Sequence, residues 1–530
     1  MKISICSAPI RQGHPQEQFA IICAAIRQAA AEGADVIILP NDFPGTYASP
    51  ARRTESGFSR SAQTAFAQLA ATAPQCLLVG HTSAISNDAP TCWTCHDGQI
   101  TMHPDGISTY RGVPLHLTID ADSPAPEHGL QICFLQAPFA KSGSHRPQPQ
   151  DRTLYVSPLG VHDYGKTIAV YDGSIYWKEV PQGVHALRHG LYRITVKDDG
   201  FHTPLPATEL SVADVLRFAL QEICTRWQVG PVIIGLSGGI DSALNLLLYR
   251  SILPPSQLLA VNMPSAYNTD TTKQLAQSLA EALAVPYLTV PIQSFAEETR
   301  RQLNEVMALH GTGKTVSQFV FENIQARDRS ARVLAALAAM YQGVFTCNGN
   351  KAELTIGYGT MYGDISGFLC AGGDLWKGEV YALADELNRV YYNGQALPPS
   401  IFTLPPSAEL SPAQNPEDGH GDPLHYPYHD CLFRAWTEGP APLDLQATVR
   451  AYREQRLADV IQTSADIHRL FPTEDDFLRD ATRWWKMYRG LAVAKRLQSP
   501  PVIALSPYPP GARCEAQHEG DDAVETFPLR

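Results

Sequence analysis

The feature that most constrains this chain is an apolar segment at residues 232–236, reading VIIGL, that runs directly into a loop rich in glycine and serine. The loop at residues 237–242 reads SGGIDS, and apolar residues at helical spacing follow it. A buried strand, a tight turn and a helix bring free backbone N–H groups and the positive end of a helix dipole to one point. Such a point favours an anion. The pattern therefore predicts a phosphate-binding loop at the end of a strand.

Side chains in this loop specify the anion further. Gly238 and Gly239 let the backbone approach a ligand closely, and Ser237 and Ser242 add hydroxyl donors. Asp241 would repel a phosphate unless a divalent cation lay between them, which predicts an Mg²⁺ ligand. The alternative, a turn without a ligand, leaves an aspartate among donors with no purpose. We expect the loop to hold the pyrophosphate end of ATP.

A second segment, at residues 311–315, contains the Gly-Lys-Thr sequence of a Walker A loop. The first glycine of that motif would have to stand at Ala308, and no strand precedes it. We therefore expect residues 311–315 to form an exposed loop.

Size and charge limit the function. A chain of 530 residues exceeds what one hydrophobic core usually organises, so two or more domains are expected. Net charge of −12 argues against a nucleic-acid partner. No apolar run reaches the length of about 18 residues that a membrane helix needs, and polar residues interrupt the N-terminal segment before a signal peptide forms. We expect a cytoplasmic enzyme without a membrane anchor.

Cysteine usage fits a reducing compartment, because the 11 cysteines show no regular framework. Residues 92–96, reading CWTCH, match a haem-attachment pattern and half of a zinc site. No second Cys/His pair lies at metal-ligand spacing, so we interpret this segment as part of a strand.

Composition along the chain predicts three parts. Residues 1–205 alternate short apolar strands with helices, which indicates a sheet-rich α/β domain. Residues 206–500 begin with an amphipathic helix and then alternate strand and helix, which predicts a parallel sheet. A Pro- and Gly-rich stretch at 399–429 is typical of an active-site loop, and residues 501–530 are expected to form an extended Pro-rich tail.

Six further motifs accompany the SGGIDS loop in a fixed order. They are ENIQAR at 322–327, GNKAEL at 349–354, GYGTMYGD at 357–364, GDLWK at 373–377, PSAEL at 406–410 and KRLQSPP at 495–501. Together they resemble the NAD synthetases of the ATP pyrophosphatase group, in the form that carries a nitrilase-like glutaminase domain. Coincidence across seven ordered motifs is implausible.

The resemblance implies a fold and a reaction. The fold is α/β, with an N-terminal nitrilase-like α-β-β-α sandwich and a C-terminal parallel-sheet domain of the adenine-nucleotide α-hydrolase type. In the implied reaction, ATP adenylates the nicotinate carboxylate of deamido-NAD, pyrophosphate leaves, and ammonia displaces AMP to give NAD. The resemblance also implies a homo-oligomer.

Roles for individual residues follow from matching the motifs. Asp241 and Glu353 can share Mg²⁺, and Lys377 and Lys351 can stabilise the departing pyrophosphate. The alternative for Glu353 is a plain charge at a helix N-terminus. The resemblance implies the catalytic residues Asp241, Lys377, Asp364 and Lys351, with Asp364 facing the amine, and ATP contacts from Ser237, Gly238, Gly239, Asp241, Ser242 and Asn348.

Substrate binding is expected from Asn323, Arg327 and Glu409. Asn323 and Arg327 are four residues apart and therefore share one face of a helix. Arg327 could instead be a solvated helix residue.

Two departures from the family pattern bear on the identity of the substrate. Asn348 stands where the family usually has threonine, and NPED at 415–418 replaces the usual Thr-Asp-Glu. A second hypothesis is therefore adenylation of a different carboxylic acid, and a third, of another class, is a non-catalytic nucleotide-binding sensor or assembly subunit.

The front domain keeps the framework of a glutaminase, seen in ADVIILP at 34–40 and VYDGS at 170–174, but not its Glu-Lys-Cys triad. Asn41 stands where the glutamate should follow the proline, and an amide cannot accept a proton at neutral pH. The chain contains no lysine between Lys2 and Lys141. Asp42 as a shifted base is the weaker alternative, because a slip of one residue turns the side chain away.

The nucleophile position depends on register. IDADSP at 119–124 fits the nucleophile segment with Asp120 in place of cysteine, and APF at 137–139 resembles the segment downstream. Cys133 is the other candidate. In either register the triad is incomplete, so we expect no glutamine hydrolysis. The enzyme would take free ammonia, ammonia from a separate protein, or another amine.

Overall fold

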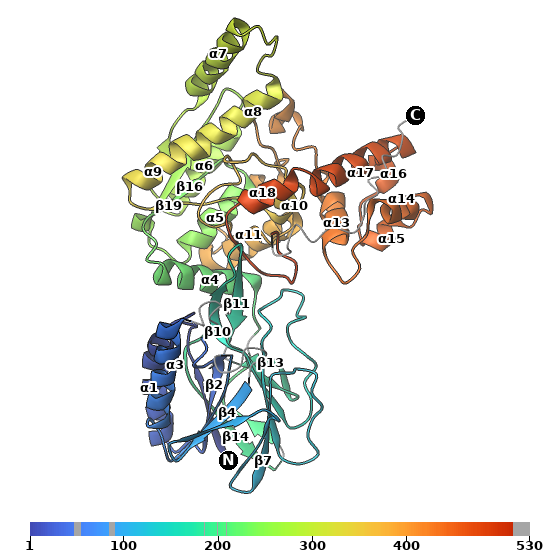
Figure 1. Cartoon of the computed structure of the whole chain (residues 1–530). Helices are drawn as coiled ribbons and strands as arrows, with labels where there is room; N and C mark the ends of the chain where they lie inside the picture. Colours follow the sequence, from blue (N-terminus) through green and yellow to red (C-terminus); the bar gives the residue numbers. More distant parts are fainter. Residues whose placement is uncertain (47–54, 84–90, 185, 199, 208, 512–530) are drawn as a thin grey trace. The chain divides into compact units, whose positions relative to one another are not determined.

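The computed structural model describes residues 1–46, 55–83, 91–184, 186–198, 200–207 and 209–511. It divides into two compact units, one of Met1–Tyr164 with Ala169–Glu222 and the other of Gly165–Ile168 with Ile223–Arg530 (Figure 1). The main division falls inside helix α4 (Val212–Arg226), which the sequence analysis assigned wholly to the second domain.

Two large sheets form most of the first unit. The seven-stranded sheet has the order β15-β14-β1-β2-β3-β4-β5, and the six-stranded sheet has the order β13-β12-β9-β8-β7-β6. Their strands are β1 (Lys2–Ser7), β2 (Val36–Asp42), β3 (Leu77–Thr82), β4 (Thr91–His96), β5 (Gln99–His103), β6 (Ile107–Tyr110), β7 (Val113–Thr118), β8 (Leu130–Phe134), β9 (Thr153–Val156), β12 (Ile175–Trp177), β13 (Val180–Val184), β14 (Gly190–Lys197) and β15 (Gly200–His202). Strands β10 (Leu159–Asp163) and β11 (Thr167–Asp172) belong to a separate three-stranded sheet.

The core of this unit lies between the sheets, where apolar residues such as Val79 of β3 and Ile132 of β8 share one buried cluster. Helices α1 (Pro15–Ala31) and α3 (Ser56–Ala70) lie side by side on the other face of the seven-stranded sheet (Figure 1). They bury residues such as Ile26 and Leu69 there. The segment with Cys92 is strand β4, as expected.

The second helical layer expected for an α-β-β-α sandwich would lie on the outer face of the six-stranded sheet. Between β4 and α4, the residues that the structure describes contain strands and loops but no helix. The sequence analysis took this layer from the family resemblance, whereas residues 135–152 cross from β8 to β9 as an irregular segment. The first unit is therefore layered as α-β-β in its described part.

A four-stranded parallel sheet is the centre of the second unit, as predicted. Its order is β18-β17-β16-β19, with the strands β16 (Val232–Gly235), β17 (Leu258–Asn262), β18 (Tyr287–Thr289) and β19 (Val344–Phe345). The strand order reverses between β16 and β19, and parallel α/β sheets bind ligands beyond the carboxyl ends of strands at such a point. The SGGIDS loop follows β16, and the GNKAEL turn follows β19.

Helices and short turns connect and extend this sheet. The first set is α5 (Ile240–Arg250), η1 (Pro255–Gln257), α6 (Asp270–Ala282), α7 (Gln293–Leu309), α8 (Gln318–Arg327), the π-helical segment η2 (Asp328–Leu334), α9 (Ala335–Met340), α10 (Lys351–Ile356), α11 (Lys377–Tyr392), α12 (Ser400–Thr403), η3 (Pro412–Gln414) and η4 (Pro416–Asp418). Residues 311–315 form an exposed loop between α7 and α8, as expected.

A region of six helices follows, before the last described residues. It comprises α13 (Tyr426–Thr437), α14 (Leu445–Arg453), α15 (Leu457–Ile461), α16 (Ile467–Leu470), α17 (Glu474–Arg489) and α18 (Ala492–Gln498). Its aromatic core, with Phe433 and Trp484, also buries Ala352 and Ile356 of α10. No helix among the described residues has the length and apolar character to cross a membrane.

The expected Pro-rich tail at 501–530 lies partly outside the described residues, which end at 511. Its beginning is not a free extension. Strand β20 (Val502–Ile503) is buried, and Leu505 is 0% exposed. The amide N–H groups of Leu505 and Ser506 each donate to Asp374 at 2.7 Å. Residues 502–506 are therefore part of the second unit.

Candidate functional site

The SGGIDS loop occupies the carboxyl end of β16 and the start of α5, where the sequence analysis put it. Ser237, Asp241 and Ser242 line two neighbouring cavities, and Gly238 and Gly239 line the first of them. The Ser242 hydroxyl donates to the Gly239 carbonyl at 2.9 Å, which fixes the turn. The loop thus presents its donors and its carboxylate to open space.

Asp241 is held from two sides. The Lys377 ammonium donates to Oδ2 at 2.5 Å, and the Asn350 amide donates to Oδ1 at 2.9 Å. The same amide group of Asn350 donates to Glu353 Oε1 at 2.9 Å. Asn350 therefore joins the two predicted metal ligands across the point where the strand order reverses. The sequence analysis quoted its motif but gave it no role, although asparagine three residues before glutamate is a helix-capping signal.

Burial and like charge control this cluster. Burial and the neighbouring Asp241 carboxylate raise the pKa of Glu353 well above its usual value, although Lys377 acts against them. Burial alone would lower the pKa of Lys377, but the Asp241 and Glu353 carboxylates outweigh it and the pKa is raised. Lys377 is thus a fixed cation beside two carboxylates that repel each other. Two carboxylates facing one cavity fit Mg²⁺, which uses one or two carboxylates together with phosphate oxygens.

The first cavity extends from the loop to the 399–429 segment. Tyr358, Tyr381 and Asp422 line it with Pro405 and Pro406. The Tyr358 hydroxyl donates to Asp422 Oδ1 at 3.3 Å and the Tyr426 hydroxyl to Oδ2 at 3.1 Å. The expected active-site loop thus does border the site, and Asp422 adds a third carboxylate that the sequence analysis missed.

The second cavity has apolar walls at the ends of β16 and β17, including Val261, Met263 and Leu334. Asn348 lines it and donates to the Gly235 carbonyl at 2.8 Å, which ties the ends of two neighbouring strands. This shape, apolar with a few polar groups, suits a purine base.

Arg329 is a second residue that the sequence analysis missed. It lies on the π-helical segment η2 and lines the second cavity. Its Nε donates to the Met263 carbonyl at 3.0 Å, and its other nitrogen donates to Asn268 Oδ1 at 3.2 Å. Burial lowers the pKa of Arg329 to about 10, although nearby carboxylates raise it. A π-helical turn is common at functional sites because it redirects a side chain, and no simple sequence pattern predicts it.

Asp364 lines both cavities and accepts the Thr360 N–H at 2.7 Å. Burial raises its pKa above the usual range. Asn323 and Arg327 instead contact the neighbouring turn: Asn323 accepts the Thr360 hydroxyl at 3.2 Å, and Arg327 Nε donates to the Met361 carbonyl at 3.1 Å. Neither lines these two cavities. The substrate contacts expected of Asn323 and Arg327 therefore stay a prediction, because neither side chain lines a cavity.

Glu409 lines both cavities, but its carboxylate is engaged. It accepts the Thr269 N–H at 3.0 Å, the Asn268 amide at 3.0 Å and the Thr272 hydroxyl at 2.9 Å. These donors lie at the start of α6. Glu409 therefore holds the 399–429 segment against that helix end.

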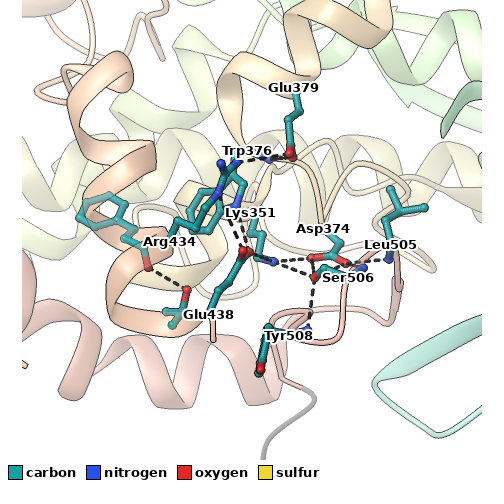
Figure 2. A network of polar contacts seen from close by, with 11 residues as sticks. Lys351, Asp374, Trp376, Glu379, Arg434, Glu438, Leu505, Ser506 and Tyr508 are labelled. Atoms are coloured by element: carbon teal, nitrogen blue, oxygen red, sulfur yellow. Dashed lines mark hydrogen bonds and ion pairs between the residues drawn. The ribbon is translucent and has the colours of Figure 1, made fainter. Parts of the chain in front are cut away.

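Lys351 corrects one expectation. The structure does not place it at either cavity with Lys377. Its ammonium instead lies 2.7 Å from Asp374 and 2.6 Å from Glu438, and it is 1% exposed (Figure 2). As the first residue of α10 it has other partners than Asn350, which contacts Asp241 and Glu353. Lys351 therefore lines neither cavity, where the sequence analysis expected it beside the phosphates.

In the first unit, Asn41 serves as a structural amide. Its amide nitrogen donates to the Ala8 carbonyl at 2.7 Å, and its oxygen accepts the Leu159 N–H at 3.2 Å. A carboxylate could not make the first of these bonds. The neighbouring Asp42 is also buried and accepts the Ser83 N–H at 2.8 Å.

The two candidate nucleophile positions are neighbours, because β7 and β8 pair in parallel. The Cys133 thiol lies 3.8 Å from the Asp120 carbonyl. Burial raises the pKa of Cys133 to about 12, and no helix begins in residues 135–152, all of which are described. Reactive cysteines need a low pKa, often from a helix N-terminus. Neither position offers a thiolate.

Comparison with known proteins bears on both units. Residues 212–468 match the protein-family model described as NAD synthase. A glutamine-dependent NAD(+) synthetase of Xylella fastidiosa (strain Temecula1) is 36% identical over 199 residues, 38% of this chain and 35% of the relative. That of Acinetobacter baylyi is 29% identical over 273 residues, 50% of this chain and 49% of the relative. The chain thus matches these curated relatives over half of their length or less.

Two solved structures cover nearly the whole chain. A glutamine-dependent NAD(+) synthetase from Cytophaga hutchinsonii has a TM-score of 0.71 at 13% identity, covering 96% of this chain and 95% of that one. The fold is that of a glutamine-dependent NAD synthetase. The enzyme from Acinetobacter baumannii, solved with ADP, has a TM-score of 0.64 at 18% identity and covers 90% and 94%. The predicted α/β combination of a nitrilase-like domain and a parallel-sheet synthetase domain is confirmed.

Gly238 gives a direct test of the loop. Its φ is +91°, and a Cβ there would lie 2.1 Å from the Thr272 carbonyl oxygen. We expect Gly238→Ala to lower the free energy of unfolding by about 2 kcal/mol or more, because strain and steric overlap add. Urea unfolding measures this. Gly239→Ala is the control, since its nearest neighbour would be the Ser237 hydroxyl at 3.4 Å. Equal losses in both variants would contradict the loop geometry.

Asn41 gives a test of the first unit. Asn41→Glu should lose the bond to Ala8 and bury a charge. Asn41→Gln has a side chain as long as that of glutamate but keeps the amide. We expect the glutamate variant to be less stable than the glutamine variant by about 1–3 kcal/mol, measured by urea unfolding at neutral pH. Equal stability, or glutaminase activity restored by Asn41→Glu, would contradict the structural role of this amide.

Proposed function

We propose that this protein is a carbon–nitrogen ligase that converts deamido-NAD to NAD, using ATP and releasing AMP and pyrophosphate. The observation that carries the proposal is the meeting of Asp241, Glu353 and Lys377 with the SGGIDS loop at one cavity, at the point where the strand order reverses. This constellation lies in the segment that matches the NAD synthase family.

In the first step, the substrate carboxylate attacks the α-phosphorus of ATP and the bond to pyrophosphate breaks. The second cavity would take the adenine against Val261 and Met263, and the loop would take the β- and γ-phosphates on its backbone N–H groups. Lys377, fixed beside Asp241, offsets the charge on the departing pyrophosphate. Mg²⁺ held by Asp241 and Glu353 would supply further neutralisation of phosphate charge.

In the second step, ammonia attacks the acyl carbon of the adenylate, AMP leaves, and the nitrogen loses a proton. Asp364 borders both cavities, and burial raises its pKa, which makes its carboxylate a stronger base. We propose Asp364 as the base that faces the amine.

The nitrogen source that we propose is ammonia, either free or supplied by a separate protein. The relatives named above are glutamine-dependent. In this chain Asn41 is committed to two structural hydrogen bonds, Cys133 is buried with a raised pKa, and no lysine stands between Lys2 and Lys141. None of the three groups that release ammonia from glutamine is supplied.

A different carboxylic acid remains the second candidate substrate, and residues 415–418 favour it. They form the turn η4, in which Asn415 accepts the Glu417 N–H at 3.0 Å and Glu417 accepts the Thr271 hydroxyl at 2.6 Å. This departure from the family pattern stands on the segment that borders the first cavity. A non-catalytic sensor is disfavoured by the fully assembled cluster around Asp241.

We also propose a homo-oligomer. Helix α7 buries only Ala296 among its residues and exposes the apolar side chains of Leu303, Val306 and Leu309. Apolar side chains at this spacing share one helix face, which would gain from a partner. Sedimentation velocity would give a single species larger than the monomer if this is right.

Activity assays test the proposal. Purified protein with ATP, Mg²⁺, deamido-NAD and ammonium should form NAD, and glutamine should not replace ammonium. Asp241→Asn should lower kcat on the order of a hundredfold, because one charge at the phosphates is lost. Asp270→Asn is the matched control, since Asp270 is a solvent-facing residue paired with Lys273.

Each contrary result has a distinct meaning. NAD formation from glutamine without a second protein would overturn the nitrogen source. Pyrophosphate release with another acid but not with deamido-NAD would select the second substrate hypothesis. No pyrophosphate release with any acid would leave the sensor hypothesis.

A further inference from the structure

A buried network of polar contacts surrounds Lys351 (Figure 2). The Lys351 ammonium contacts Asp374 Oδ1 at 2.7 Å, Glu438 Oε1 at 2.6 Å and the Ser506 hydroxyl at 3.0 Å. The side chains of Lys351 and Asp374 are 1% and 0% exposed. A buried ion pair of this kind adds little stability by itself, but loss of one partner leaves an uncompensated buried charge. Such a network specifies one arrangement of the segments that meet in it.

The segments that meet here carry the site. Lys351 follows Asn350 directly, and Asn350 donates to Asp241 at 2.9 Å. Trp376 precedes Lys377 directly, and Lys377 donates to Asp241 at 2.5 Å. The network therefore fixes the first turns of α10 and α11 one residue away from the two groups that hold Asp241.

Trp376 strengthens this joint. Its indole N–H donates to Glu438 Oε1 at 3.1 Å, the oxygen that also accepts from Lys351. The Lys351 ammonium lies 5.2 Å from the Trp376 ring, a cation–π distance. The backbone N–H of Trp376 donates to Glu379 Oε2 at 2.9 Å, which caps the start of α11. The start of α11 is thereby bound to the start of α10.

The end of the described chain completes the network. Asp374 accepts the N–H groups of Leu505 and Ser506 at 2.7 Å each and the Ser506 hydroxyl at 2.9 Å. Upstream, the Cys370 N–H donates to the Pro501 carbonyl at 2.9 Å. Residues 501–506 therefore return to the loop that leads into α11, although they are distant from it in sequence.

We propose that Lys351, Asp374 and Ser506 form a latch, in which residues 501–506 align the two helix starts around Asp241. They are positioning residues, because they touch neither cavity. The role of the latch in nucleotide and metal binding rests on the function proposed above. Its structural effect on α10 and α11 does not.

Three variants of the full-length protein test the latch. Lys351→Met removes its cation, Ser506→Ala removes one hydroxyl, and Ser499→Ala is the control. Ser499 is a buried serine in the same region whose hydroxyl donates only to the local Arg496 carbonyl at 2.8 Å. A fourth variant, Glu438→Gln added to Lys351→Met, neutralises one of the two carboxylates that lose the Lys351 cation.

Hydrogen exchange without ligands reads the latch itself. Lys351→Met should speed exchange at residues 350–356 and 376–380, Ser506→Ala should do so less, and Ser499→Ala should leave both segments unchanged. The added Glu438→Gln change should restore part of the protection, since it relieves buried charge. If Lys351→Met fails to fold, Ser506→Ala against Ser499→Ala decides.

Ligand measurements read the positioning role. Lys351→Met should raise the Mg²⁺ concentration for half-maximal binding of a non-hydrolysable ATP analogue, and lower kcat on the order of tenfold or more, with KM for the acid substrate unchanged. A variant that is less heat-stable but matches Ser499→Ala in Mg²⁺ dependence and kcat would overturn the positioning role. If the wild type forms no NAD but Lys351→Met still exchanges faster than the wild type at residues 350–356 and 376–380, the latch stands and the proposed function is rejected.

Discussion

The charge of Asp241 is the constraint around which the second unit is arranged. One carboxylate at the start of α5 is held by Lys377 from α11 and by Asn350 from the cap of α10. Glu353 lies beside it, and burial together with the Asp241 charge raises the pKa of Glu353. A parallel sheet brings these loops together only where its order reverses. The site therefore depends on β16 and β19 being neighbours, which places both loops at one edge.

The fold of the first unit depends on apolar packing and on backbone hydrogen bonds. Its two sheets are held by apolar contacts such as those of Val79 and Ile132, which need no catalytic group. Asn41 pairs with the Ala8 carbonyl after β1 and with the Leu159 N–H at the start of β10, and an amide satisfies both where a carboxylate would leave one carbonyl unpaired. No helix begins in residues 135–152, so this segment brings no helix dipole of the kind that activates thiols to Cys133.

Local patterns were predictable from the sequence, whereas tertiary choices were not. The strand, glycine loop and helix around Asp241 are contiguous, so their geometry follows from a few residues. Arg329 and Asp422 reach the cavities through a π-helical turn and a long loop, which no local period encodes. The lack of a helix between β4 and α4 in the described residues, and the burial of residues 502–506, likewise depend on contacts between segments that are distant in sequence. Lys351 shows the limit most clearly, because the direction of the first side chain of a helix is set by its neighbours.

That direction changes how loss of activity at Lys351 should be interpreted. Within one turn of α10, Asn350 and Glu353 face Asp241 while Lys351 faces Asp374 and Glu438. Because these residues share the start of α10, a movement that changes the contacts of Lys351 also moves Asn350 and Glu353 relative to Asp241. Removing the lysine would therefore disturb the carboxylates as a group, and the loss would resemble that of a catalytic residue although Lys351 touches no cavity. The shared helix start would transmit such a change from Lys351 to the carboxylates without any contact between Lys351 and a cavity.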